Sequence, residues 1–215
     1  MLENEILKEA DVIKVRLIRW LQHHNDSDLV LGNEVLYSTR QRRADLLMIK
    51  NQLLYAFEIK SEKDKVDRLD EQLEDYLSTF DFVYLVSTQK IKRNLKQALP
   101  KNAGFISIDH NNICVQKKAK RIKRHNKRNL AEFLDRSTIL KLLPSKNIAR
   151  TSIFDLRDML CQYVSGDIIH TKSVEKLYER YKRLYELFLF DTLENEVTVE
   201  DLRSLTGNIV NDKIY

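Results

Sequence analysis

Residues 44–60, ADLLMIKNQLLYAFEIK, decide the fold. Two runs rich in strand-forming residues, Ala44–Lys50 and Leu53–Lys60, are separated only by Asn51-Gln52. A two-residue connection between such runs is typical of a β-hairpin, although Asn-Gln forms a weaker turn than Asn-Gly. Both faces of both runs are apolar, and strands of this kind belong in a sheet that helices cover on both sides.

Three charged residues interrupt this apolar hairpin: Asp45, Glu58 and Lys60. If the turn pairs Lys50 with Leu53, Asp45 lies opposite Glu58, and Lys60 leaves the sheet on the same face. Carboxylates on opposed residues, with Cβ atoms about 4.5–5.5 Å apart, repel each other, and burial adds to the cost. A divalent cation bound between them reverses the sign of the interaction. Such oxygen ligands suit Mg²⁺ or Mn²⁺.

The same constellation suggests hydrolysis of a phosphodiester bond. Beside a metal ion, the Lys60 ammonium could position the nucleophile and stabilise developing charge. The alternative is that Lys60 only neutralises a carboxylate at the solvated end of the hairpin. Gln72, on the following helix, could lean towards Lys60 or be an ordinary surface residue. Glu34 could supply a third carboxylate to the metal, or be a loop acid.

The remaining chain alternates helices and strands. Apolar spacing predicts a helix over Ile6–Leu21. The other elements expected before residue 117 are strand Glu34–Thr39, helix Ser61–Phe80, strand Phe82–Ser87, helix Lys90–Leu99, and strands Gly104–Asp109 and Asn112–Gln116. Beyond residue 129 the pattern is helical throughout, with capping-box pairs at Ser152/Asp155 and Thr198/Asp201. An apolar stripe over Val174–Phe188 could form core or a dimer interface. We therefore expect a domain over residues 1–116, a basic connector over 117–128, and a helical region over 129–215.

Positive charge is concentrated in this connector. The 215-residue chain has a net charge of +5, and Lys117–Arg128 alone carries eight basic residues and no acid. These are Lys117, Lys118, Lys120, Arg121, Lys123, Arg124, Lys127 and Arg128. Such a run could neutralise phosphates of a nucleic acid, be a solvated connector, or act as a nuclear localisation signal.

Several other protein classes are disfavoured. The apolar stretches are too short to span a membrane, and the charged N-terminus lacks the apolar core of a signal peptide. Two cysteines, Cys114 and Cys161, make neither a disulfide framework nor a zinc quartet, which favours a cytoplasmic protein. The five histidines (His23, His24, His110, His125 and His170) show no zinc-binding spacing, and the sequence has no phosphate-binding glycine loop. A Cys–His nucleophilic pair stays open, although both cysteines are more simply core residues.

Asp45 on one strand, Glu58-Ile59-Lys60 on the next and Gln72 on the following helix resemble the PD-(D/E)XK nuclease superfamily. The proline of that motif is absent, since Arg43-Ala44 precedes Asp45. Within the superfamily, RRADLLMI, FEIKSEKDKVDRLDEQLEDYLSTFDFVYLVS and LPKNAGFISI resemble a small bacterial and phage family whose members mostly lack an assigned role. The similarity covers roughly Leu31–Asp109.

This resemblance implies an α/β fold of the restriction-endonuclease type: a mixed β-sheet flanked by helices, here followed by a helical C-terminal portion. It implies metal ligands at Asp45 and Glu58, a catalytic Lys60, an accessory Gln72 and a loosely matched early glutamate at Glu34. The three central residues are intact, so nothing in the motif argues for an inactive enzyme.

The leading hypothesis is a Mg²⁺- or Mn²⁺-dependent nuclease that acts on DNA. Arg40, Arg42 and Arg43, together with the basic run, would contact the nucleic acid. The alternative is a nucleic-acid-binding or inhibitory module on a nuclease fold, without turnover. No membrane partner is expected, and a homodimer through the helical region is a further hypothesis.

Overall fold

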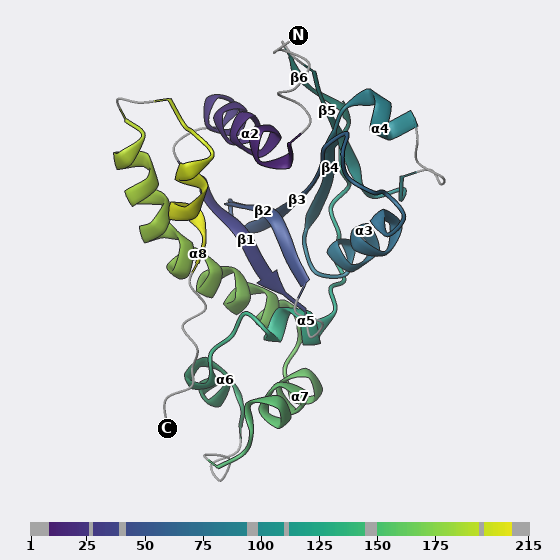
Figure 1. Ribbon diagram of the computed structural model, residues 1–215. Coiled ribbons are helices and arrows are strands. Elements are labelled where there is room, and N and C mark those ends of the chain that lie inside the picture. The colour runs from purple at the N-terminus through teal and green to yellow at the C-terminus, as the bar shows by residue number, and fades with distance from the viewer. Residues whose placement is uncertain are drawn as a thin grey trace.

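The computed structural model describes residues 9–25, 28–38, 42–93, 99–109, 112–144, 150–193 and 196–207. Within these residues the chain forms a mixed α/β fold around a six-stranded sheet (Figure 1). The strands are β1 (Val30–Tyr37), β2 (Arg42–Lys50), β3 (Leu53–Lys60), β4 (Phe82–Ser87), β5 (Gly104–Ile108) and β6 (Ile113–Lys117).

The strands follow one another across the sheet in sequence order. Strands β1, β2 and β3 run antiparallel, β3, β4 and β5 run parallel, and β6 returns antiparallel to β5. The two parallel connections carry the helices α3 (Leu69–Leu77) and α4 (Gln89–Arg93). Parallel neighbours need such crossovers, whereas the antiparallel pairs need only short turns. The predicted mixed sheet with flanking helices is confirmed.

The hairpin that organises the sheet has the predicted register, with Lys50 paired to Leu53 and Leu46 to Phe57. Asn51 and Gln52 form its turn, with φ angles of 51° and 59°. Two successive positive φ angles are the mark of a type I′ turn, whose twist matches that of the flanking strands. The turn therefore forms without glycine, and it fixes which side chains meet across β2 and β3.

Helices lie on both sides of this sheet. Figure 1 shows α2 (Ala10–His24) on one side of the sheet and α3 on the other. The remaining helices are α5 (Lys127–Ala131), α6 (Arg136–Leu142), α7 (Ile153–Tyr163), α8 (Gly166–Asp191) and the 3-10 helix η1 (Glu200–Leu205). Figure 1 also shows α5, α6 and α7 together beyond one end of the sheet. None of the helices among the described residues combines the length and apolarity that crossing a bilayer requires.

Helix α8 packs along the edge strand β1, and its apolar stripe joins the core of the sheet. Leu177, Tyr181, Tyr185 and Phe188 are all buried, as the core interpretation of this stripe predicts. Gly32 permits the contact, because a Cβ atom at this position would lie 2.8 Å from the ring of Tyr181. The absence of a side chain at Gly32 thus lets the large aromatic ring of Tyr181 lie directly on strand β1.

Some boundaries differ from those expected from the sequence. Strand β1 begins at Val30 rather than Glu34. The sequence did not indicate its first half, because the glycine and asparagine there interrupt the apolar alternation. Helix α3 begins at Leu69 rather than Ser61, because the Asp64 carboxylate accepts hydrogen bonds from the Ser61 amide and hydroxyl and stabilises a turn instead. The ends expected at Ile6 and Thr39 lie outside the described residues.

Of the two expected capping boxes, the one at Ser152 caps its helix, whereas Thr198 is not the N-cap of the 3-10 helix that follows it. The hydroxyl of Ser152 accepts a hydrogen bond from the Asp155 amide at the start of α7. The Thr198 amide and hydroxyl donate to the Asp201 carboxylate, but the segment that follows is the 3-10 helix η1.

Candidate functional site

The pairing between strands β2 and β3 ends just before Asp45 and Glu58, the two acids that the sequence analysis identified. The ladder ends at Leu46–Phe57, and continuing its register by one pair places Asp45 opposite Glu58. Beyond this pair the hydroxyl of Tyr76, on α3, replaces the neighbouring strand. It accepts a hydrogen bond from the Asp45 amide at 3.1 Å and donates one to the Arg43 carbonyl at 3.2 Å. The strand end that carries Asp45 is therefore held by a buried tyrosine.

Asp45 is partly buried and turns its side chain across the gap between the strands. Its Oδ2 accepts a hydrogen bond of 2.7 Å from the backbone amide of Ile59. Burial, followed by repulsion from Glu58, raises the pKa of Asp45 to about 7, against the opposing effects of the Ile59 amide, Lys14 and Lys60. This carboxyl group is therefore partly protonated near neutral pH unless a cation compensates its charge.

Glu58 and Lys60 form a close ion pair beside Asp45. The side chain of Glu58 is only 1% exposed, and Lys60 Nζ lies 2.7 Å from its Oε1. Neither oxygen of Glu58 has a hydrogen-bond donor in good geometry within the described residues. Burial is the largest single influence on the pKa of Lys60 and lowers it, but the charge and close contact of Glu58, together with the charges of Asp45 and Asp64, outweigh burial and raise that pKa. Lys60 is therefore held as an ammonium.

Glu34 lies on β1 opposite Asp45, just as Glu58 lies opposite Asp45 on β3. Its neighbours Asn33 and Val35 pair with β2, whereas Glu34 has a φ of 51° and interrupts the ladder opposite Asp45. The buried ammonium of Lys14, on α2, lies 2.8 Å from both Glu34 Oε1 and Asn33 Oδ1. The register thus aligns Glu34, Asp45 and Glu58 across three adjacent strands, with one lysine at each end of the row.

Gln72 lies beside this row rather than in it. It lines a cavity of about 790 Å³ together with Arg42, Arg43 and Tyr76, and Lys60 is not among the described residues that line this cavity. Arg42 is already engaged, because its Nε lies 2.8 Å from Asp75 Oδ2 on α3. Arg43 is exposed, and Arg40 lies outside the described residues. Of the two predicted arginines that the structure describes, Arg43 is therefore the one exposed at this cavity.

The basic run lies along the sheet. Backbone amides of Lys120, Ile122 and Asn126 donate to the carbonyls of Asn102, Asp81 and Ser78. Three of its eight basic side chains make close contacts within the protein. Lys117 donates to the Pro100 carbonyl, Lys127 to the last carbonyls of α7 at Cys161 and Val164, and Arg128 binds Asp158 and stacks on Phe154.

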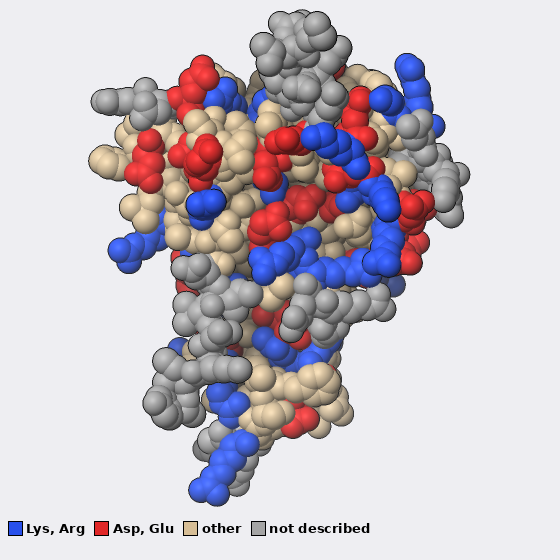
Figure 2. Space-filling model, viewed as in Figure 1, with Lys and Arg blue, Asp and Glu red and all other residues tan. Residues whose placement is uncertain are grey.

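The other five basic side chains of the run are exposed: Lys118, Lys120, Arg121, Lys123 and Arg124. Within the described part of the chain, Arg121 is the only one of these five with an ion pair, its Nε lying 3.7 Å from Asp81 Oδ1. Figure 2 shows basic and acidic side chains side by side on the face viewed, so the charges there are mixed rather than of one sign.

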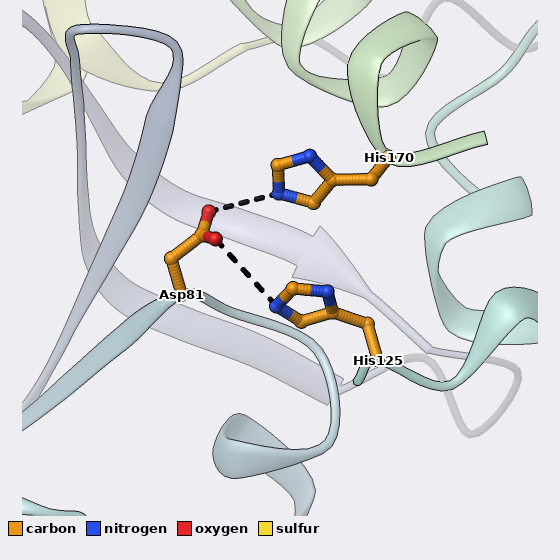
Figure 3. Close-up of side chains that lie close together, drawn as sticks. All are labelled: Asp81, His125 and His170. Atoms are coloured by element: carbon orange, nitrogen blue, oxygen red, sulfur yellow. Dashed lines mark hydrogen bonds and ion pairs between the residues drawn. The ribbon is translucent and has the colours of Figure 1, made fainter. Parts of the chain in front are cut away.

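A second group of ionisable residues lies at the opposite end of β3. Asp81, His125 and His170 each offer one ligand atom, all within 4.8 Å of one another, and could together hold a metal ion. Figure 3 shows both imidazole rings directed at the Asp81 carboxylate. The expectation that the histidines form no metal-binding pattern is thus incomplete: their spacing in sequence gives no signal, but the fold brings two of them together.

The cysteines differ partly from expectation. Cys114 is exposed on β6 and is not a core residue, because its neighbours Ile113 and Val115 face the core and the alternation of the strand turns Cys114 to the opposite side. Cys161 is half-buried on α7 and packs against the core.

Tyr76 and Lys14 are further site residues that sequence patterns did not reveal, since a tyrosine and a lysine on helices have no distinctive spacing.

Comparison with known proteins places this chain in a phage family. Residues 3–206 match the family described as bacteriophage P4 protein cII. The chain belongs to the bacteriophage P4 protein cII family. Protein cII of Enterobacteria phage P4 is 31% identical to this cII-family chain over 210 residues, which cover 94% of this chain and 79% of that protein. The expected link to phage is thereby confirmed.

A solved structure, that of a protein of unknown function from Silicibacter pomeroyi, matches this cII-family chain with a TM-score of 0.41 at 19% identity. The match covers 52% of this chain and 72% of that protein.

Proposed function

We propose that this chain is a metal-dependent nuclease that hydrolyses phosphodiester bonds in DNA. The observation that carries the proposal is the alignment of Glu34, Asp45 and Glu58 across three strands, with Lys60 paired to Glu58. A sheet that served only as scaffold would be more stable without these neighbouring like charges, of which Glu58 is fully buried and Asp45 partly buried. Their presence together with a lysine is what the PD-(D/E)XK resemblance leads us to expect.

The residues fit a hard divalent cation. Asp45 and Glu58 supply carboxylate oxygens, and both oxygens of the buried Glu58 lack a hydrogen-bond donor in good geometry within the described residues. Mg²⁺ and Mn²⁺ favour such ligands and usually retain several waters. We propose Asp45 and Glu58 as the ligands, with Glu34 as an outer carboxylate that Lys14 holds in place.

Lys60 would act as a charged hydrogen-bond donor. Because its pKa is raised, it is a poor base at neutral pH but can stabilise negative charge on a phosphate oxygen. When bound, the cation would polarise the phosphodiester and favour ionisation of the attacking water. Tyr76 positions Asp45 through the backbone, and we propose that Gln72 and Arg43 contact the nucleic acid from the neighbouring cavity.

The decisive experiment measures cleavage of supercoiled plasmid by the full chain with Mg²⁺ or Mn²⁺, using Lys60→Ala and the control Lys63→Ala. Lys63 is an exposed lysine three residues further on, so its removal changes the net charge equally. We expect Lys60→Ala to lose about 100-fold or more of the activity, on the scale of losing one transition-state donor, and Lys63→Ala to retain it. Equal residual activity in both variants would contradict the proposal.

The competing function is nucleic-acid binding, or inhibition of another protein, without turnover. The lysine contacts of Glu58 and Glu34 favour it, because they already offset part of the acidic charge. Wild-type protein that binds DNA yet cleaves none of the linear, circular, forked or RNA substrates offered with either metal would support this alternative.

We also propose that the chain forms a homodimer through its helical C-terminal region. Leu187, Leu189, Phe190 and Leu193 are large apolar side chains exposed at the end of α8 and just beyond it. Point variants test this better than truncation, because α8 also contributes to the core. Sedimentation of wild type and Phe190→Asp should give a dimer and a monomer respectively, whereas a monomeric wild type would contradict the proposal.

A further inference from the structure

Asp81 is a buried carboxylate just before β4, and two groups already bind one of its oxygens. Its side chain is 1% exposed. Oδ2 accepts a hydrogen bond of 2.9 Å from the Leu54 amide and lies 2.9 Å from His170 Nε2. These contacts fix the orientation of the carboxylate and direct its second oxygen away from β3.

That second oxygen has no hydrogen-bond partner within the described residues, although it is buried. It faces Nε2 of His125 at 3.7 Å, and this nitrogen is likewise buried and lacks a hydrogen-bond partner. Arg121 Nε also lies 3.7 Å away, but the Arg121 side chain is half exposed, so solvent screens its charge. An unpaired acceptor facing an unpaired imidazole nitrogen is costly in a protein interior and requires an explanation.

The three side chains come from separate parts of the chain. Asp81 precedes β4, His125 belongs to the basic run, and His170 lies in the first turns of α8. The two imidazole rings stack with their centroids 4.8 Å apart, and both point their Nε2 atoms at the carboxylate (Figure 3). A cavity of about 220 Å³ adjoins the group, and Asp167 also lines it.

We propose that Asp81, His125 and His170 bind one divalent transition-metal ion, of which Zn²⁺ is the simplest example. A tetrahedral Zn²⁺ with bonds of about 2.0–2.2 Å needs its ligand atoms roughly 3.3–3.5 Å apart. His170 Nε2 lies 2.9 Å from Asp81 Oδ2 and His125 Nε2 lies 3.7 Å from Asp81 Oδ1, and one ligand atom from each residue lies within 4.8 Å of the others, so small side-chain shifts would bring the three to this spacing. The ion would satisfy Asp81 Oδ1 and His125 Nε2 together, and the adjoining cavity leaves room for water as a fourth ligand.

The donor set differs from that of the proposed nuclease site. Two imidazoles and one carboxylate favour zinc and its first-row neighbours, whereas Mg²⁺ favours oxygen ligands alone. The two sites are also apart. Leu54, which binds Asp81, precedes Glu58 by four residues on β3, a distance of about 13 Å along a strand. The inference therefore does not depend on the proposed nuclease activity.

Such an ion would connect the basic run and α8 to the sheet. The Ile122 amide already donates to the Asp81 carbonyl at 2.8 Å, so the main chain beside His125 is held at the same point. A shared metal would add a bond from His125 and one from His170. Because the ion would bind only the folded state, it should raise the melting temperature. It should also fix the position of the main chain that carries the exposed lysines of the run.

The competing explanation is a hydrogen-bonded network that contains no metal. In that case His170 simply donates to Asp81, and His125 stacks on His170. The variant His170→Gln separates the two explanations, because a glutamine amide can still donate a hydrogen bond to Asp81 but is a poor metal ligand. His23→Gln is the matched control, since His23 is exposed at the end of α2.

The experiment titrates chelator-treated full-length protein with Zn²⁺ against a chromophoric chelator, and records the visible spectrum with Co²⁺ as a probe of coordination geometry. We expect one equivalent of Zn²⁺ in wild type, His23→Gln and Asp45→Asn, with a higher melting temperature when loaded. His125→Ala and His170→Gln should lose more than the roughly 10–100-fold that removal of an outer partner costs. Thermal melts without metal verify that each variant folds.

Two results would overturn the proposal. One is an absence of stoichiometric uptake by the wild type. The other is uptake that His170→Gln and His125→Ala retain, since the ion would then bind elsewhere. Loss of uptake in Asp45→Asn alone would assign the ion to the acidic row instead, and would also refute the site at Asp81. This experiment does not measure nuclease activity, so a failure of the proposed nuclease function would leave its result unaffected.

Discussion

The hydroxyl of Tyr76 bridges the Asp45 amide and the Arg43 carbonyl at the point where β2 leaves β3. It occupies the place that a neighbouring strand would fill, so the gap between the strands costs no backbone hydrogen bond at these two groups. The gap in turn gives the Asp45 carboxylate access to the Ile59 amide. A residue on α3 thereby sets the geometry of the proposed metal ligand on β2.

Tyr76→Phe should therefore weaken both the fold and the proposed site. Removing the hydroxyl leaves a buried amide and carbonyl unpaired, at a cost of about 1–3 kcal/mol in the free energy of unfolding. Urea denaturation measures this loss. Tyr55→Phe is the control, because no hydrogen bond is recorded for the Tyr55 hydroxyl within the described structure. If the two variants lose equal stability, the Tyr76 hydroxyl does not support Asp45.

Asp45 should make the fold less stable as pH rises in the absence of metal. Its pKa is about 7 in the folded protein and 3.8 in the unfolded chain. The folded state thus retains a proton that the unfolded state has released, and the stability this provides is complete below about pH 4 and lost as pH rises through 7. At pH 8, Asp45→Asn should be more stable than wild type by on the order of 2 kcal/mol, after allowance for screening.

This difference should shrink towards zero near pH 4. Urea denaturation in the presence of a chelator, repeated from pH 4 to pH 8, measures it. Asp28→Asn removes an exposed carboxylate and should show no comparable trend. Added Mn²⁺ should stabilise the wild type and not Asp45→Asn. A wild-type profile that parallels that of the asparagine variant would show that Asp45 is ionised normally.

The exposed part of the basic run should contribute charge to nucleic-acid binding. Replacing Lys118, Lys123 and Arg124 with glutamine removes three charges from exposed positions that form no ion pair with any other described residue. The slope of log affinity against log salt for duplex DNA should fall by up to about 2.7, because each phosphate contact contributes about 0.9. The control replaces Arg180, Lys182 and Arg183, exposed on α8, with glutamine. Equal slopes in the two triple variants would contradict a specific role for the run.

The hairpin was predictable because its determinants are local. A two-residue turn between two apolar runs fixes the register of β2 and β3, and this register brings Asp45 opposite Glu58. The ion pair between Glu58 and Lys60 follows from residues two apart on one strand face. The position of Glu34 was predicted only loosely, because it depends on the irregular backbone of β1.

The remaining site features depend on contacts between distant segments. Tyr76 reaches Asp45 from α3, and Lys14 reaches Glu34 from α2, without any periodic signal in the sequence. Asp81, His125 and His170 meet only because β4, the basic run and α8 converge. The sequence identified the excess of positive charge in the run, but not that Lys127 would bind the end of α7.

The contact between Gly32 and Tyr181 joins the C-terminal helices to the sheet. A Cβ at Gly32 would lie 2.8 Å from two ring carbons of a tyrosine that is only 3% exposed and cannot move without disturbing the core. Gly32→Ala should therefore cost about 1–3 kcal/mol in the free energy of unfolding, measured by urea denaturation. Gly166→Ala, at the start of α8, meets no atom closer than 3.8 Å and should be neutral or slightly stabilising. Equal stability of the two variants would mean that α8 does not pack closely on β1 in solution.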